Sequence, residues 1–205
     1  MSTTRKLLAM IFMLLAFTGG AVFMYQAIQG GRAQPAFATV WPGSKPLPEF
    51  SLMDHSGNAF TRTSLQGKWS LMFFGFTHCP DICPATLQQL AIANSRLTES
   101  GTNVPDIILV SVDPERDSPE VMAAYVSHFG GDIRGVTGDI PELRKLTSAA
   151  GIFFEKSELP SGGYSVDHSA VVLVINENGA IHASFGAPHT IDAFVNDVPV
   201  LMGSG

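Results

Sequence analysis

The chain has 205 residues, of which 45% are hydrophobic, and its formal net charge is −6 at pH 7. This mildly acidic balance contains no basic stripe of the kind that binds nucleic acid. Two cysteines are too few for a scaffold held by several disulfides, and the length fits one globular domain behind an N-terminal segment.

The N-terminal segment has the pattern of a membrane anchor. Arg5 and Lys6 precede residues 7–31, which contain no charged side chain, and a spanning helix needs about 20 mainly apolar residues. Basic residues ahead of the span predict a cytoplasmic N-terminus and a domain on the other side of the membrane. A cleaved signal peptide is the alternative, because the segment 36–38 (AFA) has the small-x-small form of a cleavage site. The uncharged stretch exceeds the apolar core of about 7–15 residues in such peptides, which favours the anchor.

These features divide the chain into three parts. Residues 1–29 are the expected anchor, and residues 30–45, rich in Gly, Ala and Pro, are the expected linker. Residues 46–205 are the expected globular domain. The sequence therefore predicts a single-pass protein of a bacterial-type inner membrane with its C-terminal domain in the periplasm. A free cysteine pair there tends to oxidise unless a metal or a reductant protects it.

Hydrophobic patterning in the domain alternates between strand and helix signals. In chain order, the expected elements are a hairpin at 50–54 and 59–61, a buried strand at 71–76, a helix at 85–97, a buried strand at 107–112, a helix at 119–129, a strand at 133–137, a helix at 140–150, a short strand at 152–156, a hairpin of strands at 169–175 and 180–185, and a helix at 191–201. The polar segment 157–167 is expected to be a loop with room to move. This order predicts an α/β domain of the thioredoxin (redoxin) type.

Both cysteines lie in the stretch 77–84 (THCPDICP), between a predicted strand and a predicted helix. Pro80 and Pro84 disfavour helical geometry at Cys79 and Cys83 respectively, and Pro84 suits the first position of a helix. We therefore expect both sulfurs in a strand-to-helix turn that faces the positive end of the helix dipole. That position lowers the thiol pKa and favours the thiolate, which attacks disulfides and binds metal. A structural disulfide is the plainer alternative, but closing so short a loop constrains the unfolded chain very little.

The stretch 77–84 resembles the signature of the Sco/SenC family, thioredoxin-like copper proteins that assist cytochrome c oxidase assembly. The segment 112–120 (VDPERDSPE) and the pair Asp167-His168 are similar to two further motifs of that family, in the expected order. The resemblance covers about residues 47–201. It implies a copper chaperone that serves the copper-bearing subunit of cytochrome c oxidase and receives its metal from an upstream copper donor.

The candidate metal ligands are Cys79, Cys83 and His168. Two thiolates alone form a redox pair or half of a metal site, and thiolate and imidazole ligands together suit copper or zinc. His168 precedes a strong strand whose start lies near the cysteines in a thioredoxin-like sheet, and the resemblance assigns it the ligand role. Three ligands suit Cu(I) and leave room for one more with Cu(II), whereas structural zinc prefers four.

Neighbouring polar residues have open interpretations. Asp167 has two possible roles. It is expected to support the site, by orienting the imidazole of His168 or tuning the charge of the site, or to be an exposed acidic residue of a loop. His78 is expected to be a neighbour of the site and not a ligand. The acid-rich segment 113–117 is either a solvated loop ahead of a helix capped by Ser118, with proline at the first helical position, or a wall of the metal site or docking surface.

A thiol-disulfide oxidoreductase that keeps the oxidase's copper-binding cysteines reduced is the alternative function. This enzyme would need Cys79 and Cys83 but not His168, whereas a chaperone without enzymatic activity would need all three. A peroxidase is disfavoured, because the Pro-x-x-x-Thr-x-x-Cys pattern is absent around Cys79.

Overall fold

The computed structural model describes residues 3–30, 33–130, 132–160 and 162–203. The chain forms two compact units, which meet in sequence between Gln34 and Pro35. The N-terminal unit contains the helix α1 (Thr3–Gly30), which covers most of the expected anchor. Among the described residues, no helix combines the length and the apolar character that crossing a membrane requires.

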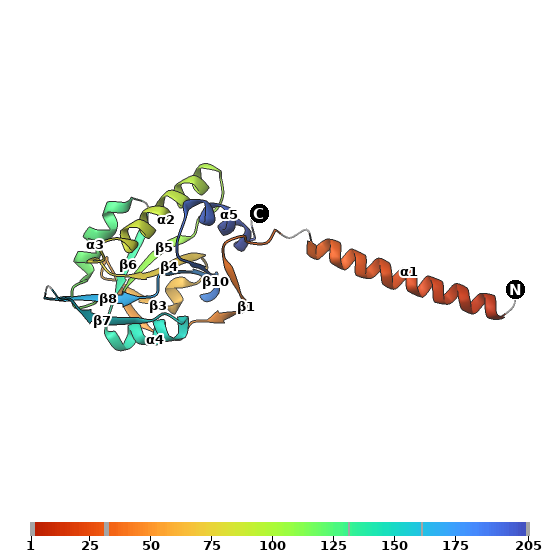
Figure 1. Cartoon of the computed structure of the whole chain (residues 1–205), viewed down its shortest axis with the longest axis horizontal. Helices are drawn as coiled ribbons and strands as arrows, with labels where there is room; N and C mark the ends of the chain where they lie inside the picture. Colours follow the sequence, from red (N-terminus) through yellow and green to blue (C-terminus); the bar gives the residue numbers. More distant parts are fainter. Residues whose placement is uncertain (1–2, 31–32, 131, 161, 204–205) are drawn as a thin grey trace. The chain divides into compact units, whose positions relative to one another are not determined.

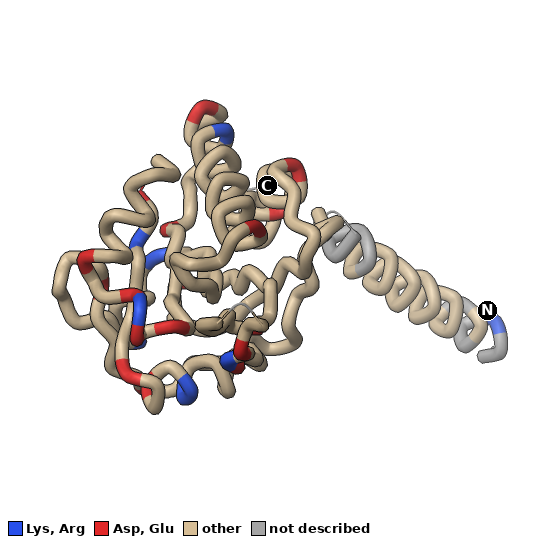
Figure 2. The backbone as a smooth tube through the Cα atoms, turned by 60° about the vertical axis from the view of Figure 1, so that its left-hand side comes forward, with Lys and Arg blue, Asp and Glu red and all other residues tan. Residues whose placement is uncertain are grey.

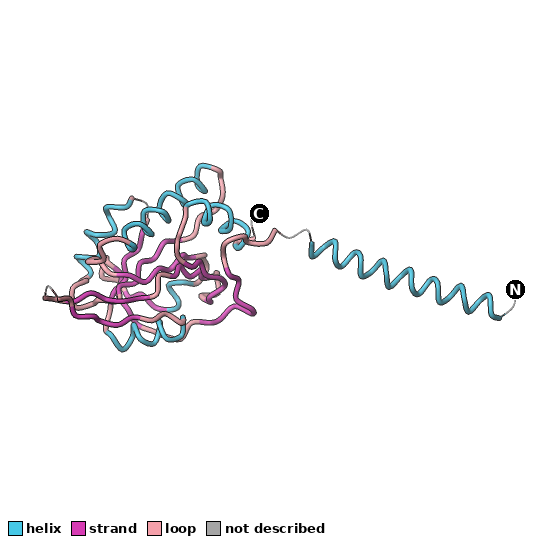
Figure 3. Tube along the Cα trace, viewed as in Figure 1, coloured by secondary structure: helices cyan, strands magenta, loops and turns pink. Residues whose placement is uncertain are grey.

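The second unit is built on a mixed sheet, whose strands are magenta in Figure 3. The strand order is β1-β10-β9-β4-β5-β6-β2-β3. The strands are β1 (Thr39–Pro46), β2 (Ser51–Asp54), β3 (Ala59–Thr61), β4 (Ser70–Gly75), β5 (Asp106–Ser111), β6 (Ile133–Thr137), β9 (Val171–Ile175) and β10 (Ala180–Gly186). The central strand β4 is parallel to β5 and antiparallel to β9. Every residue of β4 is buried, as expected for a strand covered on both faces.

Helices cover both faces of this sheet. The helices α2 (Ile82–Glu99), α3 (Pro119–Val126) and α5 (Ile191–Leu201) lie over one face, and α4 (Ile140–Ala150) lies over the other (Figure 1). Short 3₁₀ turns occur at η1 (Arg62–Leu65) and η2 (Ser127–Phe129). Leu87 and Leu90 of α2 and Phe194 of α5 are fully buried, so each helix turns an apolar stripe toward the sheet. The predicted α/β architecture is confirmed.

Most elements of the domain lie where apolar runs and turn residues predict them. The helix α5 has the predicted bounds, and β4, β5, β6, α4, β9 and β10 agree within two residues at each end. Ser118 caps α3, as predicted, by accepting a hydrogen bond from the Val121 N–H at 3.4 Å, and Pro119 follows it as the first helical residue. These elements are the ones whose signals are local, namely continuous apolar stretches and helix caps.

The structure differs from the expected linker over its second half, because β1 pairs antiparallel with β10 as an edge strand of the sheet. A register shift between Val40 and Lys45 accommodates Pro42 and Gly43, residue types that are tolerated at sheet edges. Ahead of β1, the backbone N–H groups of 36–38 donate to the buried carboxylate of Asp197 at 2.9, 2.6 and 2.7 Å. The domain therefore begins before residue 46.

The prediction of a loop at 157–167 is wrong. Strands β7 (Phe154–Glu158) and β8 (Tyr164–His168) pair as an antiparallel hairpin that forms a second sheet of its own. Phe154 and Val166 are buried, while Glu155, Lys156 and Asp167 are exposed. Polar residues on the outer face and glycines in the turn conceal this alternation in the sequence. His168, predicted to follow a loop, is the last residue of the strand β8.

Lys and Arg residues are interspersed with Asp and Glu residues over the domain (Figure 2). The ion pair between Lys156 and Glu115, at 2.6 Å, joins the hairpin to the segment 113–117. A surface pair of this kind contributes little to stability, so other contacts must hold the hairpin in place.

Candidate metal centre

The two cysteines lie where β4 ends and α2 begins. Cys79 is in the connecting turn, where its N–H donates to the Phe76 carbonyl at 3.2 Å, and Cys83 is in the first turn of α2. The prediction of a turn position therefore holds for Cys79 but not for Cys83, because α2 begins earlier than its apolar pattern indicates. Pro84 is not the first helical residue; it is tolerated because the first four N–H groups of a helix have no intrahelical acceptor. Both thiols are free and buried.

A glycine of the central strand makes room for Cys83. A Cβ atom at Gly75 would lie 2.8 Å from Cys83 Sγ, 3.1 Å from the Phe73 ring and 3.3 Å from Leu109 Cδ1. Only a residue without a side chain allows the sulfur to pack this close to the strand. The sequence signal for this role is a glycine inside a buried strand beside the cysteine motif.

Gly75→Ala is expected to displace the Cys83 thiol and lower the free energy of unfolding by about 1–3 kcal/mol, because the added methyl overpacks a filled space. Chemical denaturation measures this change. Gly186→Ala on β10 is the matched control, since a Cβ there meets no atom within 4 Å. Equal stability of the two variants would contradict the close packing of Cys83 on β4.

The two thiols differ strongly in acidity. A hydrogen bond from the Cys83 side chain lowers the pKa of Cys79 to about 5, and the backbone N–H groups of Cys83 and Asp81 act in the same direction. The same side-chain bond raises the pKa of Cys83, and burial raises it further. Near neutral pH the pair is therefore one thiolate, at Cys79, that accepts a hydrogen bond from one thiol, at Cys83.

His168 approaches Cys83 from the end of β8. Its Nε2 lies 3.5 Å from Cys83 Sγ, and its Nδ1 lies 3.0 Å from the Val166 carbonyl oxygen. Because a carbonyl only accepts, Nδ1 donates its proton to Val166, which leaves Nε2 as the nitrogen that faces the sulfur and is available to a metal ion. The rings of Phe76 and Phe73 pack edge-on against the imidazole. Contacts with the backbone and with two aromatic rings thus set the orientation of the imidazole, as is usual for a histidine that binds metal through its other nitrogen.

The separation of Cys83 and His168 fits a shared metal ion. Metal–sulfur bonds of about 2.3 Å and metal–nitrogen bonds of about 2.0 Å place the two ligand atoms roughly 3.5 Å apart at a tetrahedral angle. The observed distance is 3.5 Å. Within the described ranges, however, no three His, Cys, Asp or Glu side chains stand together as a ready-made metal cage. Cys79, joined to Cys83 by the thiol hydrogen bond, would complete the set by turning toward the ion.

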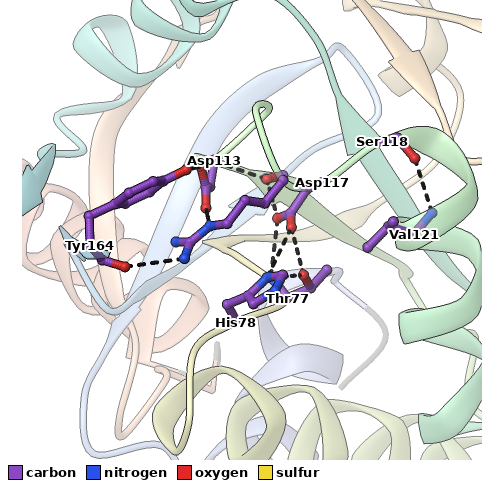
Figure 4. Close-up of polar contacts among 9 residues, drawn as sticks. Thr77, His78, Asp113, Asp117, Ser118, Val121 and Tyr164 are labelled. Atoms are coloured by element: carbon purple, nitrogen blue, oxygen red, sulfur yellow. Dashed lines mark hydrogen bonds and ion pairs between the residues drawn. The ribbon is translucent and has the colours of Figure 1, made fainter. Parts of the chain in front are cut away.

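The segment 113–117 contacts the turn that leads into Cys79, through Asp117 and Thr77 (Figure 4). Asp113 and Asp117 are fully buried, so the interpretation as a solvated loop is wrong for both. Asp117 accepts hydrogen bonds from the Thr77 N–H at 3.1 Å, from the Thr77 hydroxyl at 2.6 Å and from the Ser111 hydroxyl at 2.5 Å. This buried carboxylate anchors the strand end that leads into Cys79.

Two polar residues near the site lie apart from the sulfurs. Asp167 is exposed and accepts a hydrogen bond from Ser157 across the hairpin, because adjacent residues of a strand point to opposite faces. The Val166 carbonyl instead makes the orienting contact to His168, which requires the unpredicted strand. The side chain of His78 is 55% exposed and contacts the Thr77 hydroxyl at 3.0 Å, in agreement with the role of a neighbour.

Comparison with known proteins places the chain among copper-binding relatives. The SCO1/SenC family model matches residues 32–203. A protein of Stutzerimonas stutzeri named as copper-binding is 30% identical over 161 residues, which are 78% of this chain and 79% of that protein. The mitochondrial SCO1 homolog 1 of Arabidopsis thaliana is 36% identical over 150 residues, which are 73% of this chain but 45% of that protein. The chain thus spans about half the length of this mitochondrial relative.

Solved structures agree with the fold. Arabidopsis thaliana ScoI with copper bound has a TM-score of 0.72 and 34% identity, over 77% of this chain and 98% of that chain. Yeast Sco1 with copper bound has a TM-score of 0.69 and 31% identity, over 75% of this chain and 86% of that chain. Both alignments cover three quarters of the chain, so the thioredoxin-like architecture is shared with proteins that hold copper.

Proposed function

Because the chain belongs to the SCO1/SenC family, we propose that it is a copper chaperone that assists maturation of the copper centre of cytochrome c oxidase. Cys79, Cys83 and His168 are the proposed ligands, and the copper-bearing oxidase subunit is the proposed recipient. Copper is the cargo of the protein, received from an upstream donor and passed on.

The 3.5 Å approach of His168 Nε2 to Cys83 Sγ carries this proposal. Two soft thiolates and one imidazole suit Cu(I), and the acidic Cys79 supplies the first thiolate near neutral pH. Cys83 must release its proton to bind the metal, so binding releases protons. A site of three ligands leaves a position open for an added ligand with Cu(II) or for a ligand of the recipient.

A copper titration of the reduced full chain tests this proposal. The reduced chain is expected to bind about one copper ion, because the proposed site offers one set of soft ligands. Competition with a chelator of known affinity measures the stoichiometry and the dissociation constant. If several copper ions bound with similar affinity, and the titration showed no break at one copper ion per chain, the result would contradict a dedicated site.

Thiol-disulfide reduction is the second candidate function, and the difference in acidity between the thiols favours it. The Cys79 thiolate would attack one sulfur of a target disulfide and expel the other sulfur as a thiolate, which takes the proton of Cys83. The Cys83 thiolate would then attack Cys79 Sγ in the mixed disulfide and expel the second target sulfur as a thiolate, which takes a proton from water. The cysteines lose two electrons and the target gains two. His168 is not required for either step.

For location, we propose a single-pass anchor in a bacterial-type inner membrane, with the C-terminal domain in the periplasm. Arg5 and Lys6, ahead of the uncharged residues 7–31, support this topology. Cleavage after residue 38 would remove the three N–H donors of Asp197, which argues against a signal peptide cut at that point.

Cell fractionation tests the topology. The full-length chain is expected in the membrane fraction, because an uncut N-terminal segment would remain inserted. A periplasm-dependent reporter fused to the C-terminus is expected to be active. A shortened chain in the soluble fraction would instead support cleavage of a signal peptide.

A further inference from the structure

Three side chains close a clasp between the segment 113–117 and the hairpin β7–β8 (Figure 4). Arg116 Nη1 donates to the Tyr164 carbonyl oxygen at 3.1 Å, and the Tyr164 hydroxyl donates to Asp113 Oδ1 at 2.8 Å. Arg116 Nε donates to the other oxygen of Asp113. The guanidinium also stacks on the Tyr164 ring, with its carbon 3.9 Å from the ring centroid.

Burial makes this clasp specific. The Asp113 side chain is 0% exposed and that of Arg116 is 25% exposed. Opening of the hairpin would remove the Tyr164 hydroxyl from this buried carboxylate. A buried polar group that loses a hydrogen bond is destabilised, so Asp113 favours the closed arrangement. The planar fork of arginine serves the carboxylate and the carbonyl at once, which the point charge of lysine does not reproduce.

The clasp lies at the opposite end of β8 from His168. Tyr164 begins the strand and His168 ends it, about 13 Å apart at the rise of an extended chain. The strands β7 and β8 form a two-stranded sheet of their own, and a two-stranded hairpin is at best marginally stable by itself. Its position therefore depends on anchors such as this one.

A second contact leads from the clasp to the imidazole. The guanidinium carbon of Arg116 lies 5.7 Å from the Phe76 ring centroid, and the Phe76 ring packs edge-on against His168 at 5.6 Å between centroids. Arg116 thus supports His168 both through β8 and through the aromatic ring beside it.

We propose that Arg116 and Tyr164 are positioning residues, which hold the hairpin so that His168 Nε2 stays beside Cys83. This inference rests on the proposed role of His168 as a copper ligand. Release of the clasp frees the hairpin end and withdraws the nitrogen from the metal, while both sulfurs remain in place, one in the turn before α2 and one in the first turn of that helix.

Variants of the reduced full chain test the clasp. Arg116→Met removes the fork and the charge, Arg116→Lys removes the fork alone, and Tyr164→Phe removes the hydroxyl bond to Asp113. Arg96→Met is the matched control, because Arg96 forms a surface pair with Asp192 at 3.4 Å. Tyr164→Phe, the mildest change, carries the test if an arginine variant does not fold.

Amide hydrogen exchange of the copper-free protein is the first measurement. Exchange at Val166–His168 is expected to be about tenfold faster in all three clasp variants, because local opening becomes easier. It should be unchanged in Arg96→Met. Exchange at the parent rate in all three clasp variants would overturn the proposal. Exchange at the parent rate in Arg116→Lys alone would also overturn it, because the positive charge, and not the planar fork of arginine, would then hold the hairpin.

Electron paramagnetic resonance of the Cu(II) form is the second measurement. The clasp variants are expected to lose nitrogen coupling from His168 while retaining the thiolate-to-copper absorption band. Nitrogen coupling that persists in all variants would overturn the proposal, because a merely stabilising role lowers melting temperature without changing the ligand set. If the parent itself shows no nitrogen coupling, the proposed function fails, and hydrogen exchange still decides whether the clasp positions the hairpin.

Discussion

Replacing either cysteine with serine is expected to weaken Cu(I) binding more than about 100-fold, since loss of an outer-shell partner alone costs about 10–100-fold. A serine hydroxyl is a hard oxygen donor that does not replace a thiolate for Cu(I). The two variants differ in what remains. Cys83→Ser keeps a hydroxyl that can donate to the Cys79 thiolate, whereas Cys79→Ser removes the more acidic thiol. Chelator competition under reducing conditions measures both affinities.

The oxidised parent is the matched control for these variants, because it keeps every other side chain and only joins the two sulfurs in a disulfide. A Cys79–Cys83 disulfide offers no thiolate, so the oxidised protein is expected to lose its copper affinity and regain it on reduction. Equal copper affinity of the oxidised parent and the reduced parent would place the site elsewhere in the chain.

The fold could be predicted wherever the signal was local. The strand β4 and the helix α5 carry continuous or periodic apolar residues, and both lie where predicted. The strand β1 contains prolines and a glycine and pairs with residues more than a hundred positions away, so its composition indicated a linker. The hairpin β7–β8 buries little more than Phe154 and Val166, which is too weak an alternation to detect beside one proline and two glycines.

The candidate site was less predictable than the fold. The cysteine spacing indicated thiolate chemistry, but Cys83 and His168 are separated by 85 residues, and their approach depends on where the hairpin lies. The family resemblance suggested this pair. The roles of Gly75 and of the Val166 carbonyl depend on contacts between elements that are distant in sequence. The exposure of Asp167 follows from the alternation of side chains along β8, a strand that the sequence pattern does not reveal.

His168→Ala is expected to separate the two candidate functions. The substitution removes the imidazole nitrogen beside Cys83 and leaves both sulfurs and the helix end in place. Copper affinity should fall by more than about 10–100-fold, the range for outer-shell partners, and oxidase activity in cells should fall with it. Thiol-disulfide exchange proceeds by thiolate attack and needs no imidazole ligand, so the variant should still cycle between dithiol and disulfide.

His182→Ala is the matched control, because it removes an imidazole that contacts the Ser44 hydroxyl at 3.1 Å and packs against Trp69. The loss of packing against Phe73 and Phe76 lowers the stability of His168→Ala, so the melting temperatures of both variants are compared with that of the parent. Chelator competition, the reduction potential and oxidase activity then measure copper binding, exchange and function. Oxidase assembly that is normal in His168→Ala cells but lost with either cysteine variant would contradict the chaperone and support the reductase, because the sulfurs alone would then account for the phenotype.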